Sequence, residues 1–191
     1  MNYILKRHII KIPKNITIYY CANNYLVICT NSSNKKRMIL KTKLLIDSKK
    51  NIIKVTRQPF FTISNNEKKK LKAYQGTQVS LLKQMFLDVS HFFCKKLDLV
   101  GVGFRVQLML KKEFNLLQFK LGFSHLIYFK IPKNLKIFCL KTNRLYILGN
   151  SYLFVTQIAA LIRTYKIPEP YKGKGILYAT ETVKLKEGKK I

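Results

Sequence analysis

Two segments of the chain carry apolar side chains at the spacing of one helical face. The first runs from about residue 71 to residue 93, and its apolar stripe consists of Leu82, Met85, Phe86, Val89 and Phe93. The second segment repeats this spacing in Phe154, Ile158, Leu161, Ile162 and Tyr165. Asn150 or Ser151 can cap its start, and Pro168 cannot continue it. Both segments are therefore predicted to be helices that bury this stripe in a core.

Alternating apolar residues between these two segments predict a β-hairpin. Every second residue from Val100 to Leu110 is apolar. After a turn at 111–115 the alternation resumes in Leu117, Phe119, Leu121 and Phe123. Because side chains two residues apart point to the same side of a strand, each run has one face suited to burial.

A short motif occurs twice and suggests an internal duplication. The sequence IPKN stands at residues 12–15 and again at 131–134, and residues 16–30 then align without a gap with residues 135–149. Each copy has two β-rich runs around a polar turn, at 22–24 and at 141–143. The alignment predicts a duplicated unit in which both hairpins have the same strand pairing.

These patterns together predict an α+β fold of two tandem lobes, each an antiparallel β-sheet packed on one α-helix. The first lobe is expected to span residues 1–94, and the second residues 95–191, ending in a basic segment. Residues 34–54 are basic and poorly patterned, so we expect a loop there that meets RNA or a neighbouring protein. The first residues lack the Arg and Ser enrichment of a transit peptide, so no cleaved targeting segment is expected.

The charge of the chain points to a polyanionic partner. Against 37 Lys and Arg there are 8 Asp and Glu, which gives a formal net charge of +29. Bound nucleic acid or anionic lipid would relieve this self-repulsion, and the 48% of hydrophobic residues suffices for a core. No run approaches the roughly 20 apolar residues that span a bilayer. The lysines occupy every segment instead of one helical face, which disfavours membrane attachment.

Side chains for catalysis or metal binding are few and scattered. The 8 carboxylates form no pair at a spacing suited to acid–base chemistry. His91 and Cys94 lie at the end of an apolar helix, where packing explains them better than nucleophilic catalysis. With Cys21, Cys29 and Cys139, the cysteines form no C-x-x-C pair, so neither zinc nor disulfides are indicated and buried free thiols are expected. We predict no enzymatic activity, cofactor, metal or small-molecule substrate.

The segment after the second helix has the features of a loop that binds a phosphate backbone. Pro168 and Pro170 stiffen the chain, and Lys172 and Lys174 are each followed by a glycine. Glycines let the main chain approach a phosphate, so that N–H and ammonium groups act together, while Tyr171 can stack on a sugar or base. A solvated basic loop is the alternative interpretation. A P-loop is excluded because the G-x-x-x-x-G-K-[ST] pattern is missing.

The run PEPYKGKG at residues 168–175 resembles the signature of the large-subunit ribosomal protein L6 family. LVGVGFR at 99–105 resembles the strand that opens the second lobe in that family, and LGFSH at 121–125 resembles its next strand and turn. Gly76-Thr77, Leu81-Leu82 and the KKL at 95–97 fit the same order. The resemblance covers nearly the whole chain and is strongest from Gly76 to Lys190.

This resemblance implies a two-lobed protein whose second lobe docks on large-subunit ribosomal RNA near the sarcin-ricin loop and the factor-binding region. It also implies neighbouring ribosomal proteins as partners. The RNA contacts that it implies in this chain are Tyr171, Lys172, Gly173, Lys174, Gly175, Lys186, Lys189 and Lys190. Arg163, Ser124 and His125 follow as contacts of second rank, and a structural role for His125 is equally compatible with its place beside a strand end.

Some residues depart from the family pattern, including Leu126 in place of a proline and Leu177 in place of a basic residue. The excess of Lys over Arg and the abundance of Ile, Asn, Phe and Tyr are typical of an AT-rich genome. This composition favours a mitochondrial ribosome and an organelle-encoded gene, with a plastid or a bacterial cytoplasm as alternatives. The competing function is a basic DNA-binding module unrelated to the ribosome, although helix-turn-helix and zinc patterns are missing.

Overall fold

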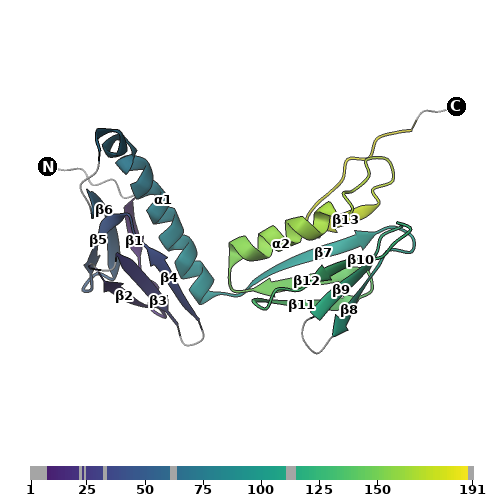
Figure 1. Cartoon of the computed structure of the whole chain (residues 1–191), viewed down its shortest axis with the longest axis horizontal. Coiled ribbons are helices and arrows are strands. Elements are labelled where there is room, and N and C mark those ends of the chain that lie inside the picture. Colours follow the sequence, from purple (N-terminus) through teal and green to yellow (C-terminus); the bar gives the residue numbers. More distant parts are fainter. Residues whose placement is uncertain are drawn as a thin grey trace. The chain divides into compact units, whose positions relative to one another are not determined.

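The computed structural model describes residues 8–21, 23, 25–31, 34–60, 64–110 and 115–188. The chain divides into two compact units, the first ending at His91 and the second beginning at Phe92 (Figure 1). Each unit combines antiparallel sheets with one helix, so the predicted α+β class is confirmed. Across the described residues, no helix is both long enough and apolar enough to cross a membrane.

The first unit packs a helix against two antiparallel sheets of three strands, with the orders β1-β6-β5 and β2-β3-β4. Its elements are β1 Ile9–Lys11, β2 Thr17–Cys21, β3 Leu26–Thr30, β4 Lys35–Ile39, β5 Thr42–Asp47, β6 Ile52–Pro59 and α1 Asn65–Ser90. Val27, Ile53 and Leu82 are fully buried in one core that both sheets share with α1. The stripe residues Leu82, Met85, Phe86 and Val89 are thus buried in this core, as their spacing predicted.

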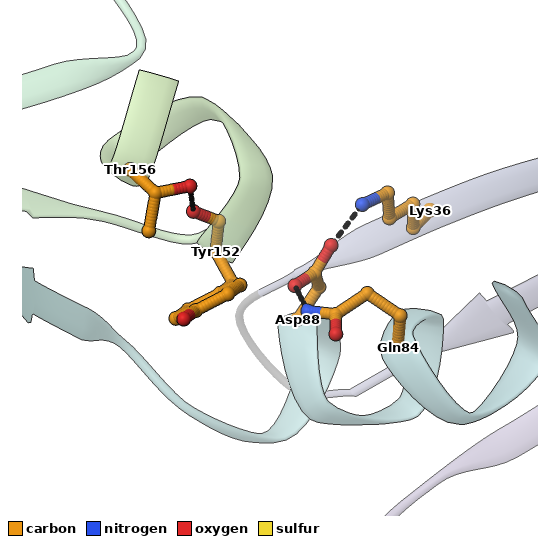
Figure 2. A network of polar contacts seen from close by, with 5 residues as sticks. All are labelled: Lys36, Gln84, Asp88, Tyr152 and Thr156. Atoms are coloured by element: carbon orange, nitrogen blue, oxygen red, sulfur yellow. Dashed lines mark hydrogen bonds and ion pairs between the residues drawn. The ribbon is translucent and has the colours of Figure 1, made fainter. Parts of the chain in front are cut away.

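Residues 34–54, which were expected to form a loop, form β4, β5 and the start of β6 instead. The alternation of apolar and polar residues that marks a strand is obscured in β4, because Lys36 occupies a half-buried position whereas Ile39 is 75% exposed. Lys36 can turn toward the core because the buried Asp88 of α1 accepts a hydrogen bond from its ammonium group (Figure 2). A lysine at a half-buried position breaks the apolar alternation by which a strand is recognised.

The second unit has the same construction with one additional strand. Its sheets have the orders β11-β12-β7-β13 and β10-β9-β8. Its elements are β7 Phe93–Val100, β8 Arg105–Leu110, β9 Asn115–Lys120, β10 Ile127–Lys130, β11 Leu135–Lys141, β12 Arg144–Gly149, α2 Tyr152–Thr164 and β13 Gly175–Tyr178. Leu97, Phe119, Ile147 and Ile162 are fully buried between the two sheets and α2. The hairpin predicted after residue 100 is β8–β9, while Val102 lies in the preceding turn and is 91% exposed.

The two units repeat each other, but not in the alignment that the sequence suggested. The sheet β1-β6-β5 corresponds to β7-β12-β11, and β2-β3-β4 corresponds to β8-β9-β10. The repeated IPKN motif instead aligned β2–β3 with β11–β12, which are not equivalent. Their registers differ as well, because Ile18 pairs with Cys29 whereas the aligned Ile137 pairs with Ile147 and not with Leu148. The motif is therefore accidental, and the duplication lies in the topology.

The first helix has different bounds from those predicted. It begins before residue 71 because Ser64 caps it: the Ser64 N–H donates a hydrogen bond to the Glu67 carboxylate at 3.3 Å. It ends at Ser90, since His91 is extended with φ −131° and ψ 151°. Phe93 was assigned to the helical stripe but lies in β7. The turns expected at 22–24 and 111–115 fall largely outside the described residues.

The second helix begins after Ser151, one of the two N-caps that the sequence offered. Its buried residues are Val155, Ile158, Ala159 and Ile162. Leu161 is 46% exposed, so its place in the predicted stripe was wrong. Gly149 lets α2 lie close to the sheet, because a Cβ there would be 2.5 Å from Leu135 Cδ2 and 2.9 Å from Val155 Cγ2. This close packing fixes the first turn of α2 against the sheet.

The four cysteines are free. Cys29 is buried, and desolvation raises the pKa of its thiol to about 12. Cys21 and Cys94 are exposed on β2 and β7 and Cys139 is half-buried, so the expectation of buried thiols is confirmed for Cys29 alone. The described residues contain no group of three or more His, Cys, Asp or Glu placed to hold a metal ion.

Candidate nucleic-acid interface

The residues between α2 and β13 form a closed loop held by main-chain hydrogen bonds. Ile176 N–H donates to Lys166 O at 2.8 Å, which joins the two ends of the loop. Within it, Glu169 N–H donates to Lys174 O and Gly173 N–H donates to Glu169 O, both at 2.9 Å. Because β13 pairs with β7, the loop is tied to the four-stranded sheet as well as to the helix.

Prolines and glycines determine the local geometry of this loop. Pro168 and Pro170 restrict φ and bring no N–H group that needs a partner. Gly173 has a φ of +65°, a left-handed conformation that residues with a Cβ rarely adopt. Gly175 is buried against Pro168, where a Cβ would lie 2.6 Å from the Pro168 Cα. The two glycines thus shape the loop, and Gly175 does so by close packing.

The tip of the loop presents an aromatic ring and two cations. Tyr171 is 54% exposed, Lys172 is exposed and Lys174 is half-buried. Within the described part of the chain, no carboxylate lies within salt-bridge distance of either lysine. A stiff main chain that carries unpaired ammonium groups next to a tyrosine can bind phosphate and stack on a sugar or base at the same time.

The tail after β13 returns to this loop. Lys186 N–H donates to Pro170 O at 2.9 Å, and Leu185 Cδ2 lies 3.4 Å from where a Cβ on Gly173 would be. The exposed Lys186 is therefore held beside Lys172 and Lys174 by the fold. The predicted contacts Lys189 and Lys190 lie outside the described residues.

Arg163 holds the start of the tail against the end of α2. Its Nε donates to Glu181 Oε2 at 3.1 Å and one terminal nitrogen donates to Oε1 at 2.5 Å. The guanidinium carbon also lies 5.6 Å from the centre of the Tyr178 ring. The hydrogen bond from Arg163 lowers the pKa of the Glu181 carboxyl, and the same bond raises the pKa of Arg163. The structure thus gives this predicted contact a structural role.

The turn between β9 and β10 joins the loop through stacked side chains. Lys166 Nζ lies 4.3 Å from the centre of the Phe123 ring, and the Phe123 and His125 rings stack at 5.8 Å and 21°. Ser124 and His125 are both exposed on this turn. Lys166 was not predicted as part of the site, although its place just before the two prolines was the available sequence signal. Lys166 therefore links the β9–β10 turn to the start of the loop.

The geometry defines a class of protein: a basic, duplicated α+β fold with a cationic loop closed by main-chain hydrogen bonds. Comparison with known proteins then shows that the chain belongs to the ribosomal protein L6 family. The family model for ribosomal protein L6 matches residues 100–179, from the last residue of β7 to just beyond β13. This match contains the loop and the β9–β10 turn.

Individual relatives extend the similarity to almost the full chain. With the large ribosomal subunit protein uL6m of Reclinomonas americana, identity is 37% over 182 residues, which cover 95% of each chain. With uL6 of Mycoplasma capricolum, identity is 36% over 181 residues, covering 95% of this chain and 94% of the relative. With uL6 of Buchnera aphidicola, identity is 43% over 118 residues, covering 62% and 65%.

Proposed function

We propose that this protein is a structural constituent of the large ribosomal subunit that binds ribosomal RNA near the sarcin-ricin loop and the factor-binding region. The observation that carries the proposal is the rigid loop at 166–176, which presents Tyr171 and Lys172 and holds Lys186 beside them. Family membership supports a location in the ribosome, and the net charge of +29 supports RNA as the binding partner. Neighbouring ribosomal proteins complete the set of partners.

In this proposal, affinity and position have separate sources. The dispersed lysines release counterions from the phosphate backbone and supply affinity without sequence preference. The loop, fixed by Gly175 against Pro168, determines where the second unit docks. Arg163 then acts by holding the tail, and Lys166, Ser124 and His125 extend the contact surface. We further propose that residues 1–94 and 95–191 act as separate domains, a view supported by the division after His91.

The role is architectural and non-catalytic in this proposal, since the loop offers cations and a ring without a nucleophile–base pair. We assign the protein to a mitochondrial ribosome, with an organelle-encoded gene. The uL6m of Reclinomonas americana and the composition support this assignment. Plastid and bacterial ribosomes are the alternatives, because bacterial uL6 proteins match at similar identity.

A titration against large-subunit RNA containing the sarcin-ricin region tests the loop. Lys172→Ala with Lys174→Ala is expected to weaken binding by roughly 2–4 kcal/mol and to lower the slope of log K against log salt by about 1.5. The matched control replaces Lys133 and Lys136, two exposed lysines of the same unit. An equal loss of RNA affinity in the control would show that the two loop lysines act only through nonspecific charge. Unchanged affinity in both variants would refute the proposed site.

The ribosomal assignment itself is tested by sedimentation of native lysate in high salt. Migration with the large subunit supports it, and the compartment purified identifies the ribosome. Recovery only in DNA-bound fractions would favour the DNA-binding module instead.

A further inference from the structure

The N-terminal part of α1 extends beyond the core of its own unit. α1 has 26 residues, but among those whose burial is described the first buried one is Gln75, and Glu67, Lys68, Lys69, Lys70 and Lys72 are all exposed. The equivalent helix α2 has 13 residues, and Val155 is already buried one turn after its start. Since α2 covers the same kind of sheet with half the length, the extension is not required by the fold. We call residues 67–74 the helical arm.

The composition of the arm opposes its own helix. Lys68 and Lys72 stand at i and i+4, where like charges repel. All four lysines lie in the first two turns, at the end where the helix dipole disfavours cations. A helical stretch of this length without packing is marginal in water. The capping contact between Ser64 and Glu67 offsets part of this cost and fixes where the arm begins.

Further cations gather at the base of the arm. Lys41, in the turn between β4 and β5, lies with its Nζ 4.7 Å from the centre of the Tyr74 ring. Arg57 at the end of β6 donates from Nε to Gln75 Oε1 at 3.2 Å. Three separate segments of the first unit therefore bring positive charge to one place.

We propose that this helical arm, with Lys41 and Arg57 at its base, is a second RNA-binding surface that contacts the phosphate backbone independently of the loop in the second unit. Its lysines point in several directions around the helix, as a groove with phosphates on both walls requires. A protein interface or a membrane would need apolar anchors. Between Ser64 and Ser80 of the described chain, no large hydrophobic side chain is exposed.

The test compares the full-length protein with a variant that carries Lys69→Gln, Lys70→Gln and Lys72→Gln, substitutions that preserve helix propensity. The probe is a short RNA duplex of arbitrary sequence, titrated over a range of salt. The slope of log K against log salt should fall by about 2–3, and affinity at moderate salt should drop roughly 10-fold or more. Arginine at the same three positions should restore both, and circular dichroism should show unchanged helix content.

The matched control replaces three exposed lysines elsewhere in the same unit, Lys11, Lys14 and Lys49, by glutamine. It loses the same charge, so an equal fall in slope would overturn the proposal. Binding to polyglutamate or to phosphatidylserine–phosphatidylcholine vesicles is measured in parallel. A loss confined to either of these, with RNA binding unchanged, would also overturn it. Combined with Lys172→Ala and Lys174→Ala, the arm variant should show additive losses, since independent surfaces add.

Discussion

Lys36 of β4 donates a hydrogen bond to Asp88 of α1, whose side chain is 1% exposed (Figure 2). Gln84 Nε2 donates to the other oxygen of the same carboxylate at 2.8 Å. This pair ties the C-terminal part of α1 to the sheet β2-β3-β4 inside the first unit. A buried carboxylate that loses its cation is strongly destabilising, whereas an apolar replacement of both partners is far less so.

Lys36→Met is therefore expected to destabilise the first unit by about 1–3 kcal/mol, since Lys36 is partly exposed and Asp88 keeps its bond from Gln84. Lys36→Met combined with Asp88→Leu should recover most of that loss. Urea denaturation, followed by amide exchange in α1, measures both variants. A single variant as stable as the parent would show that the pair contributes nothing to the packing of α1.

Stability should depend on pH through Glu181. Because Arg163 lowers the folded-state pKa of this carboxyl, its contribution is present above the ordinary glutamate range and is lost as pH falls through the depressed folded value. Glu181→Gln should remove this part of the acid dependence and loosen the tail at pH values where the parent carboxyl is ionised. NMR titration of the Tyr178 and Glu181 amides provides the readout. An acid profile identical in parent and variant would contradict the assignment.

Gly175→Ala should displace the loop at 166–176, which we propose binds RNA. The new Cβ would meet the Pro168 main chain at 2.6 Å, so the loop has to move away from β13 at a cost of about 1–3 kcal/mol. RNA affinity should fall while the second unit stays folded. Gly188→Ala is the control, because nothing lies within 4 Å of a Cβ there. Equal RNA affinity of the two variants would show that the geometry of the loop does not determine RNA binding.

Periodicity predicted the elements whose exposure alternates regularly. The stripe from Leu82 to Val89 was found because α1 buries an unbroken face over that part. Residues 34–54 were missed because Lys36 takes a half-buried place, and only its buried partner 52 residues away explains it. The repeat was misaligned because β-rich runs after a proline resemble one another whatever their position in a sheet.

The loop could be predicted because its geometry is local: prolines, glycines and lysines stand next to one another in sequence. What the sequence could not reveal were the contacts that bring distant residues to it. The return of Lys186 depends on one main-chain hydrogen bond to Pro170, and the place of His125 depends on stacking on Phe123 beside Lys166. The ion pair between Arg163 and Glu181 could not be read from the sequence either, because the two residues lie 18 positions apart.

Among the described residues of the first unit, no strand corresponds to β13, which changes the edge of its own sheet. Without it, the eight-residue strand β7 would expose a row of unsatisfied main-chain groups. With β13 in place, the edge strand of the sheet has only four residues and directly follows the loop at 166–176. A short edge strand offers few main-chain groups with which a strand of another chain can pair. The strand that anchors the proposed RNA-binding loop therefore also leaves its sheet with an edge that resists strand-to-strand aggregation.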